Sequence, residues 1–479
     1  MIFFSLAGDI SKMETTQEKP TVIVKRCETY DQARIMEIFQ NGMAELDFKP
    51  RGKVFVKPNV VFSTKDGKYG STAYTDTAVI GGSLLALSRT KGVRRVDMGE
   101  KTAIGYPTRL TFKNAGYYDV LKTIQPQTEA PVRIFCIDEH LRDRVFVGGK
   151  VHDTLKISRK MARADCKVYL PKLKCHCVSS MTGAVKLNIG ICSDDERAIR
   201  HDFLLNDKIV DLLEVGIPDF IMMDAIDVGV GNEAVPTPRK LGLIIMGTNP
   251  LAVDLVGARL LGFNLKDVPY LQRAVERGYT PSDINDIRIT GDLHSVEDLD
   301  KAAERLLPYD DEYFRWQNIE KDLARLNCPI RFYWGYTHRR EQKKCMTGCI
   351  MGIKMFFGFL ERYAGAEAFK NAKPAVMVVG EIQETIDAKR QEVFMIGSCS
   401  RATIVNAKKI TKIDNCFTTA VDLAQTIRGR LGIPAPILDA EEVLPLIKNF
   451  AIASVMKLIS FRYFQDIGFF LKRGLQKRI

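Results

Sequence analysis

The sequence lacks the signatures of several common protein classes. It has no repeat of fixed period and no low-complexity segment, and the apolar start Met1–Leu6 has no positively charged flank of the kind that opens a secretory signal. There is no zinc-finger spacing, no aromatic-studded RNA-binding strand and no long block of Lys or Arg. The net charge of +12 is spread along the chain, so it indicates a basic surface, and no nucleic-acid partner is expected.

Eleven cysteines are present, an odd number in a chain far larger than disulfide-stapled secreted domains. This usage predicts a reducing compartment, with thiols that are free or hold metal. We therefore expect a cytoplasmic protein. The 479 residues, 46% of them hydrophobic, predict two or three folded domains.

Short apolar strands alternate with amphipathic helices over the first two-thirds of the chain. This alternation predicts an α/β domain over residues 21–310, with a mainly parallel sheet covered by helices, after a leader at residues 1–20. Strands are expected at 21–25, 53–56, 93–98, 132–137, 167–170, 220–225 and 243–246, and helices at 31–46, 76–91, 250–261 and 268–277.

The pattern changes after residue 291, and a domain boundary is expected near 310–330. Residues 328–440 contain clustered cysteines, a helical stretch at 355–363 and short strands at 375–379 and 392–396, which predict a smaller α+β domain. Residues 441–479 form an apolar, basic, helical tail that charges interrupt too often for a membrane span. Two fates remain open for it: docking on protein, or peripheral contact with an anionic membrane, such as the inner membrane face.

Basic and amide side chains gather after two of the predicted strands. Lys57 and Asn59 follow the strand at 53–56, and ligands in open α/β sheets bind beyond the carboxyl ends of strands. The strand at 167–170 precedes a denser cluster with two glycines, Gly183 and Gly190, and the side chains Lys172, Lys174, His176, Lys186, Asn188 and His201. A helix beginning near Thr182 would add backbone N–H donors. The cluster predicts a site for a small anionic substrate, in which histidine could move protons.

Two carboxylates lie near further predicted strand ends. Asp224 ends an apolar strand beside a glycine-rich loop, where it could bind a divalent ion or orient a ligand. Asp254 lies one turn inside the helix that begins near Pro250, where a structural cap and a catalytic role are equally open.

Six sequence elements together resemble the family known as domain of unknown function 362, over about residues 50–295. They are K-P-N at 57–59, P-K-L-K-C-H at 171–176, T-G-A-V-K-L-N-I-G at 182–190, His201, the strand end at Asp224 and G-T-N-P-L-A-V-D at 247–254. Members are often joined to ferredoxin-like modules, and some carry iron–sulfur centres. The resemblance implies no particular reaction.

A fainter resemblance is to the nickel-pincer lactate racemase family. It implies that Lys186 would match the lysine that anchors the pincer cofactor and His201 the histidine that binds nickel, with His176 at an earlier histidine position. Residues 99–108, where that family has another catalytic histidine, contain none. The resemblance therefore implies a shared pocket with changed chemistry.

Four cysteines fall within residues 345–416, namely Cys345, Cys349, Cys399 and Cys416. Gly348 and Gly397 lie beside them and would let backbone amides turn toward thiolate sulfurs. Four thiolates are the ligand set of a 4Fe–4S cluster or, as the alternative, a structural zinc. Separate buried core cysteines would be the structural explanation.

The favoured function is an iron–sulfur oxidoreductase or electron-transfer protein acting on a small anionic ligand, with a redox partner protein. Lys57, Asn59, Lys172, Lys174, Asn188 and Asp254 would bind the ligand, and His176, Lys186, His201 and Asp224 would take part in the chemistry. A non-redox, metal-dependent isomerase or racemase and a membrane-associated scaffold are the alternatives.

Overall fold

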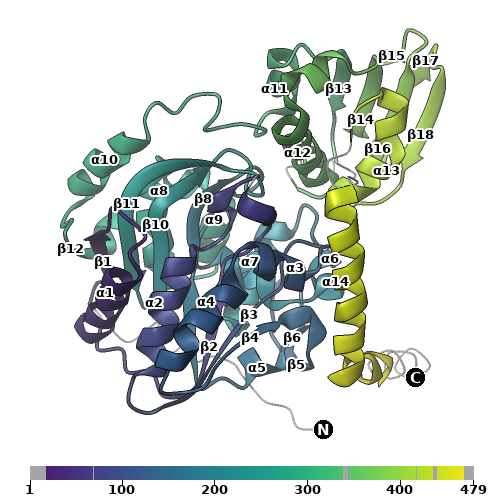
Figure 1. Cartoon of the computed structure of the whole chain (residues 1–479). Helices are drawn as coiled ribbons and strands as arrows, with labels where there is room; N and C mark the ends of the chain where they lie inside the picture. The colour runs from purple at the N-terminus through teal and green to yellow at the C-terminus, as the bar shows by residue number, and fades with distance from the viewer. Residues whose placement is uncertain are drawn as a thin grey trace.

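The computed structural model describes residues 18–67, 69–337, 344–345, 347–416, 418–434 and 440–468. Most of the predicted leader therefore lies outside the described residues. The larger part of the molecule is built on one wide sheet, and a smaller part with its own sheet sits at one corner of it (Figure 1).

The large sheet is mainly parallel, as predicted. Its neighbouring strands run parallel from β10 to β4, and β11 pairs antiparallel with both β10 and β1. A side branch, β8 (Lys172–His176) with β9 (Ser180–Thr182), pairs with β10. The strand order is β12 (Arg288–Gly291), β1 (Thr21–Arg26), β11 (Thr237–Gly247), β10 (Phe220–Val230), β7 (Cys166–Leu170), β2 (Gly52–Pro58), β3 (Val93–Glu100) and β4 (Val132–Cys136).

Helices cover both faces of this sheet, which explains why its strands are apolar on both sides. In β1, Val22 and Val24 belong to one core and Ile23 to the other, because successive side chains point to opposite faces. One core is covered by α1 (Gln32–Glu45), α2 (Thr77–Ser88), α3 (Thr108–Asn114) and α4 (Tyr117–Ile124), and the other by α7 (Leu205–Val215), α8 (Pro250–Leu260), α9 (Pro269–Glu276) and α10 (Val296–Ala303).

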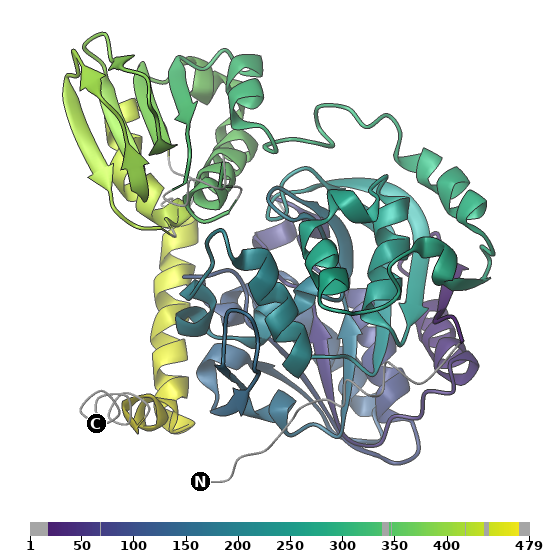
Figure 2. The same cartoon turned by 180° about the vertical axis from the view of Figure 1, so that it is seen from behind.

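The smaller sheet consists of four parallel strands with helices on it. Its order is β13 (Ile330–Trp334), β14 (Ala375–Glu381), β16 (Glu392–Arg401) and β18 (Lys409–Ile413). Its main core also contains side chains of α11 (Ile319–Arg325), α12 (Cys349–Lys370) and α13 (Ala420–Leu431). Figure 2 shows this part from behind, joined to the large sheet by the segment after α10.

The long C-terminal helix, α14 (Ala440–Ile459), runs from the smaller part down the side of the larger one (Figure 1). No single helix of the described residues is long and apolar enough to cross a membrane. Only the pair Val443–Ile459 and Arg462–Gly468, bent by 70°, passes that test of length and composition together.

One local expectation differs in the structure. The segment from Lys172 to Thr182 forms the short strands β8 and β9. The helix expected near Thr182 is instead a single 3-10 segment at Lys186–Ile191, and Asp254 accepts hydrogen bonds from the backbone amides just before it.

Candidate functional site

The first candidate site lies where the strand order of the large sheet reverses. From β2 the chain moves outward to β3 and β4, and then returns to the other side of β2 as β7, so that Pro58 pairs with Leu170. Ligands of open α/β sheets bind at the carboxyl ends of strands at such a switch point. A small pocket of about 50 Å³ opens there, and we call it the cation pocket; its polar lining is Asn59, Glu100, Lys101, Lys174, His176, Thr182, Lys186, Arg197 and Glu233.

A buried ion pair forms one wall of the cation pocket. The Lys57 ammonium, at the end of β2, contacts the Glu100 carboxylate, at the end of β3, and both side chains are buried. Burial lowers the pKa of Lys57 and raises the pKa of Glu100. A Cβ on Gly190 would lie 1.8 Å from the Glu100 carboxylate, so only glycine fits at this position.

His176 and Glu233 form the opposite wall. His176 Nδ1 accepts hydrogen bonds from the amides of Val178 (3.2 Å) and Ser179 (3.3 Å), which assigns the imidazole proton to Nε2, 3.3 Å from Glu233 Oε1. Burial lowers the pKa of His176 to about 3, so the ring is neutral near pH 7. Donor atoms of His176, Cys177 and Glu233 lie within 4.8 Å of one another, close enough to share a metal ion.

Lys186 brings an unpaired cation to the pocket. Within the described residues its ammonium makes no hydrogen bond and no ion pair, in contrast to Lys174, which donates to the carbonyls of Ala73 (2.7 Å) and Glu233 (3.0 Å). Burial lowers the pKa of Lys186 to about 8. A ligand anion would supply the negative partner that the Lys186 ammonium lacks.

Six of the predicted ligand or catalytic residues do not line this pocket, namely Lys57, Lys172, Asn188, His201, Asp224 and Asp254. Lys57 contacts the lining residue Glu100, and four of the others make contacts elsewhere. Lys172 and Asp224 form a buried ion pair of 2.8 Å that also contacts the Tyr30 hydroxyl. Asn188 accepts a hydrogen bond of 2.6 Å from the Tyr169 hydroxyl inside the core. Asp254 accepts hydrogen bonds from the amides of Ala184 (2.6 Å) and Val185 (3.1 Å), and thus fixes the turn that leads to Lys186.

The second candidate site lies at the carboxyl ends of the strands of the smaller sheet. Cys399 is on β16, Cys416 follows β18, Cys345 precedes α12, and Cys349 is its first residue. All four line one small pocket, together with Phe203 of the larger part of the molecule. We call it the cysteine pocket. Folding brings together thiols that are up to 71 residues apart (416 − 345).

Two glycines make room for the sulfurs. Gly397 has φ +98°, and a Cβ there would lie 3.1 Å from the Cys349 sulfur. Gly348 has φ +62°, and a Cβ there would lie 2.7 Å from the carbonyl oxygen of Cys416. Since both positions have positive φ, other residue types would be strained there as well as crowded.

The four thiols line one pocket without forming a tight cluster. Among the described residues, the group of three ligand side chains within 4.8 Å of one another is the His176 triad, so no three of the four sulfurs lie that close together. Sulfurs around a single zinc would be roughly 3.8 Å apart, given Zn–S bonds of about 2.3 Å. Burial raises the pKa of Cys345, Cys349 and Cys416, to about 11 for Cys416, and nearby thiols add to the shift.

The two pockets are neighbours. The Thr347 hydroxyl, between Cys345 and Cys349, donates to the carbonyl of Asp202, the residue after His201. From α12, Lys354 donates to the carbonyl of Cys177 at 2.6 Å, beside the His176 wall of the cation pocket. His201 is buried between them, and burial, with Lys208, Arg197 and Lys186 nearby, lowers its pKa well below the ordinary value.

Three residues of this arrangement were not among the predicted site residues. Glu100 and Glu233 supply the carboxylates of the cation pocket, and Lys354 connects it to α12. Glu100 lies just beyond the predicted strand at 93–98, and this position at a strand end could have identified it as a site residue. No local pattern could have identified Lys354, because its partner lies 177 residues away in the chain.

Part of this chain is similar to a known protein family. Residues 54–259 match the model of a family described as a domain of unknown function, DUF362. A thylakoid-associated protein of Synechocystis sp. (strain ATCC 27184 / PCC 6803 / Kazusa) is 24% identical over 241 residues, which cover 49% of this chain and 70% of that protein.

Two solved structures are similar at low sequence identity. The lactate racemase apoprotein from Thermoanaerobacterium thermosaccharolyticum has a TM-score of 0.33 and 12% identity, over 51% of this chain and 57% of that one. A protein from Thermotoga maritima has a TM-score of 0.28 and 10% identity, over 74% of this chain and 73% of that one. The chain thus spans little more than half the length of the racemase.

Proposed function

Because residues 54–259 form a domain of the DUF362 family, to which no activity is attached, we propose a function from the two pockets themselves. The protein is an iron–sulfur oxidoreductase or electron-transfer protein that acts on a small anionic ligand. The observation that carries this proposal is the gathering of four cysteines in one pocket beside the cation pocket.

The cysteine pocket would hold the cluster. Its donor set is four thiols, and no three of their sulfurs lie within 4.8 Å of one another, which favours a 4Fe–4S cluster over the alternative zinc ion. Cys349 is the first residue of α12, where the helix dipole favours a thiolate. When bound, such a cluster supplies one-electron transfer. Its electrons would come from, or go to, a redox partner protein.

The cation pocket would hold the ligand. Lys186 offers an unpaired ammonium and Arg197 a second positive charge, in a space of about 50 Å³ that suits a small carboxylate or phosphate. Lys186, with a pKa of about 8, is better matched to proton transfer near neutral pH than His176, with a pKa of about 3. His176 would instead hold its Nε2 proton toward Glu233 and orient the wall. The Lys57–Glu100 ion pair would hold the other wall of the cation pocket in place.

Metal analysis of the full chain, purified without oxygen, tests the proposal. We expect a brown protein with about four irons and matching acid-labile sulfide per chain. A colourless preparation without iron would contradict the redox proposal. Zinc at one equivalent in place of iron would reassign the cysteine pocket as structural.

One observation favours a second candidate, a non-redox metal-dependent isomerase. The triad of His176, Cys177 and Glu233 could bind a divalent ion in the cation pocket. A metal other than iron that is lost in Glu233→Gln, while any iron stays, would support this alternative. Retention of all metal in Glu233→Gln would argue against it.

The working location is also a proposal. The cyanobacterial relative is named for its association with thylakoids, which supports a protein that works at a membrane surface, on its cytoplasmic side.

A further inference from the structure

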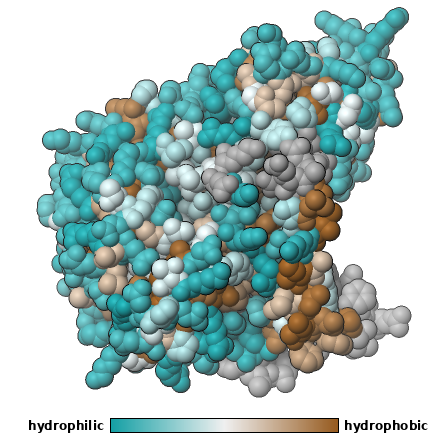
Figure 3. All heavy atoms as spheres, viewed as in Figure 1, coloured by the Kyte–Doolittle hydropathy of each residue, from teal (hydrophilic) through white to brown (hydrophobic). Residues whose placement is uncertain are grey.

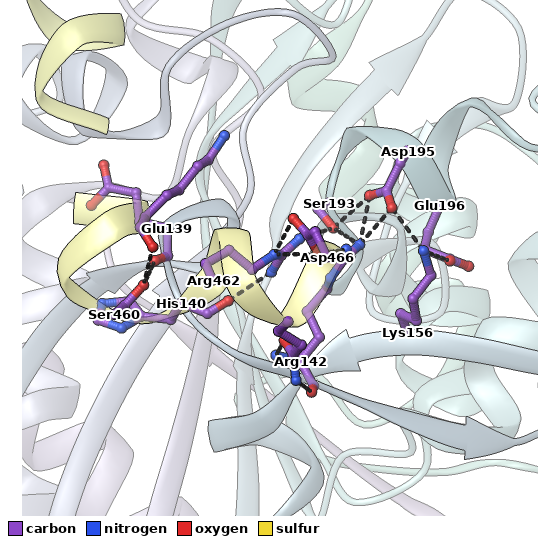
Figure 4. Close-up of polar contacts among 12 residues, drawn as sticks. Glu139, His140, Arg142, Lys156, Ser193, Asp195, Glu196, Ser460, Arg462 and Asp466 are labelled. Carbon is purple, nitrogen blue, oxygen red and sulfur yellow. Dashed lines mark hydrogen bonds and ion pairs between the residues drawn. The ribbon is translucent and has the colours of Figure 1, made fainter. Parts of the chain in front are cut away.

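The C-terminal segment contacts the rest of the protein in an unusual orientation. An amphipathic helix normally buries its apolar face against protein. Here the short helix Arg462–Gly468, which follows α14, turns polar side chains toward the large domain, and both helices leave apolar side chains exposed. Figure 4 shows the inward polar contacts, and Figure 3 shows apolar side chains along the outer side of α14.

A polar lock fixes the short helix on the large domain. Arg462 is buried and donates to the His140 carbonyl (2.6 Å), to Ser193 Oγ (3.1 Å) and to Asp466 (3.0 Å). Arg142, at the start of β5 (Arg142–Phe146), contacts the same Asp466 carboxylate and donates to Ser193 Oγ at 2.7 Å. We call Arg142, Ser193, Arg462 and Asp466 the polar lock (Figure 4).

Backbone contacts add to this lock. The Gln465 side chain accepts from the Arg142 amide (2.8 Å) and donates to the Arg142 carbonyl (2.6 Å), and Ser460 donates to the Glu139 carbonyl (2.5 Å). These bonds satisfy groups that would otherwise be buried without partners. The orientation of the segment is therefore specified by the protein, and its apolar side is held outward.

The outward side is a continuous apolar surface. On α14 the exposed apolar residues recur at helical spacing along one face, and the short helix continues them beyond the bend. We call this set the apolar ridge: Leu444 (68% exposed), Ile447 (60%), Val455 (55%), Leu458 (55%), Phe461 (67%), Phe464 (60%) and Ile467 (56%). Exposed apolar surfaces of this extent mark sites of protein or membrane contact.

Charge around the ridge favours a membrane with anionic lipids. Lys448 is exposed on the same helix. Directly after the short helix, the sequence of residues 469–479 contains four basic residues (Lys472, Arg473, Lys477 and Arg478) and no acidic one. Basic residues next to a bilayer attract anionic headgroups, and aromatic and aliphatic side chains enter the interface beside them.

We propose that the apolar ridge lies in the surface of an anionic bilayer, parallel to its plane, while the polar lock holds the protein against it. The ridge enters only the interfacial layer, because its inner side is occupied by the protein's own contacts. Since α14 runs down the side of the larger part of the molecule, such a bilayer would lie beside that part (Figure 1). This inference deepens the proposed membrane location and is independent of the redox proposal.

Flotation of the full chain with vesicles tests the inference. We expect the protein to float with vesicles of phosphatidylglycerol and phosphatidylcholine, and less with phosphatidylcholine alone or at high salt. Ile447→Ser/Leu458→Ser/Phe464→Ser/Ile467→Ser should partition at least about tenfold more weakly, because each change removes exposed apolar surface only. The matched control is Val405→Ser/Ile410→Ser, two exposed apolar residues of the smaller part of the molecule, which should float like the wild type.

Three outcomes would overturn the inference. Wild-type protein that stays unbound with both vesicle types would do so, as would a ridge variant that floats as well as the wild type. A stable dimer, seen by light scattering, that vesicles do not dissociate and the ridge variant cannot form would identify a second copy as the occupant. Iron content, measured on the same samples, separates these outcomes from failure of the redox proposal.

Discussion

The cation pocket and the cysteine pocket lie at equivalent places in two different sheets, but different kinds of side chain line them. Both lie at the carboxyl ends of parallel strands, where loops converge. The cation pocket satisfies most of its charges internally, through pairs such as Lys57–Glu100 and His176–Glu233. The cysteine pocket gathers buried thiols that have raised pKa values and few partners.

This difference indicates which bound group each pocket requires. Within the described residues, the cation pocket presents one ammonium without a hydrogen bond or ion pair, that of Lys186, to a ligand. The cysteine pocket brings four soft ligands together, and none of the described residues that line it is cationic. A metal centre would complete the second pocket, whereas the first needs only a ligand that comes and goes.

The largest expected effect is the loss of iron when one ligand of the cysteine pocket is replaced. Cys349→Ser should lower the iron content from about four to below about one per chain, because one ligand of the cluster is lost. Iron and sulfide assays after anaerobic purification measure this. Cys328→Ser, outside the pocket, is the matched control and should keep its iron. Equal iron content in both variants would show that Cys349 is not a ligand of the cluster.

The next effect addresses the cation pocket. Pyridoxal 5′-phosphate, an anionic aldehyde, should label Lys186 because its phosphate suits the pocket and its aldehyde reacts with neutral amines. Lys186 has a pKa of about 8, so labelling should fall roughly fiftyfold from pH 8 to pH 6, as the ammonium form takes over. Mass spectrometry after borohydride reduction locates the label.

Matched variants sharpen that labelling experiment. Lys186→Met should lose the label and keep its iron, whereas Lys448→Met, on the exposed side of α14, should keep the label. Uniform labelling of surface lysines without a preference for Lys186 would count against the anion site.

A smaller effect concerns the residue that positions the Lys186 turn. Burial raises the pKa of Asp254 to about 7, so the folded protein holds this proton more tightly than the unfolded chain, whose carboxyl has the ordinary value of 3.8. Stability from this group is therefore complete below about pH 4 and is lost as the pH rises to about 7, at about 1.4 kcal/mol per pKa unit.

Asp254→Asn should remove this pH dependence, because an amide does not titrate. Urea unfolding at pH 5 and pH 8 measures it, with Glu276→Gln, an exposed ion-pair residue, as the control. A wild-type protein that gains stability over that interval through this group would show the opposite sign and contradict the assignment.

The smallest effect tests the contact between the two pockets. Thr347→Val removes the hydroxyl that donates to the Asp202 carbonyl and should destabilise the protein by ~1 kcal/mol. Thr426→Val, within α13, removes a comparable hydroxyl bond away from the pockets and is the control for iron retention. Faster loss of iron in Thr347→Val than in Thr426→Val would tie the contact to the cysteine pocket.

Much of the fold could be predicted from local pattern. The strands expected at 53–56, 167–170 and 220–225 correspond to β2, β7 and β10, since both faces of a central parallel strand are apolar and its sequence shows this directly. The prediction was weaker where few apolar residues are involved. The segment after Leu170 was expected to form a loop and a helix, and it forms β8, β9 and a 3-10 segment.

For the candidate site, the sequence identified the residue types but not their grouping. His176 and Lys186 share a pocket, whereas Lys172 and Asp224 pair elsewhere, although all four come from neighbouring strand ends. The reason is that Lys172 and His176 stand at opposite ends of β8, although they lie on the same face of the strand, and a list of motifs does not give that separation.

By itself, the sequence determined the alternation of strands and helices, the cationic cluster after β7 and the presence of four late cysteines, because burial pattern and residue chemistry are local properties. Only the tertiary structure decided that the four cysteines line one pocket, that α12 contacts the segment beside the cation pocket, and that α14 leaves apolar side chains exposed. Those outcomes depend on contacts between residues far apart in the chain, such as Arg142 with Asp466, and no local pattern encodes them.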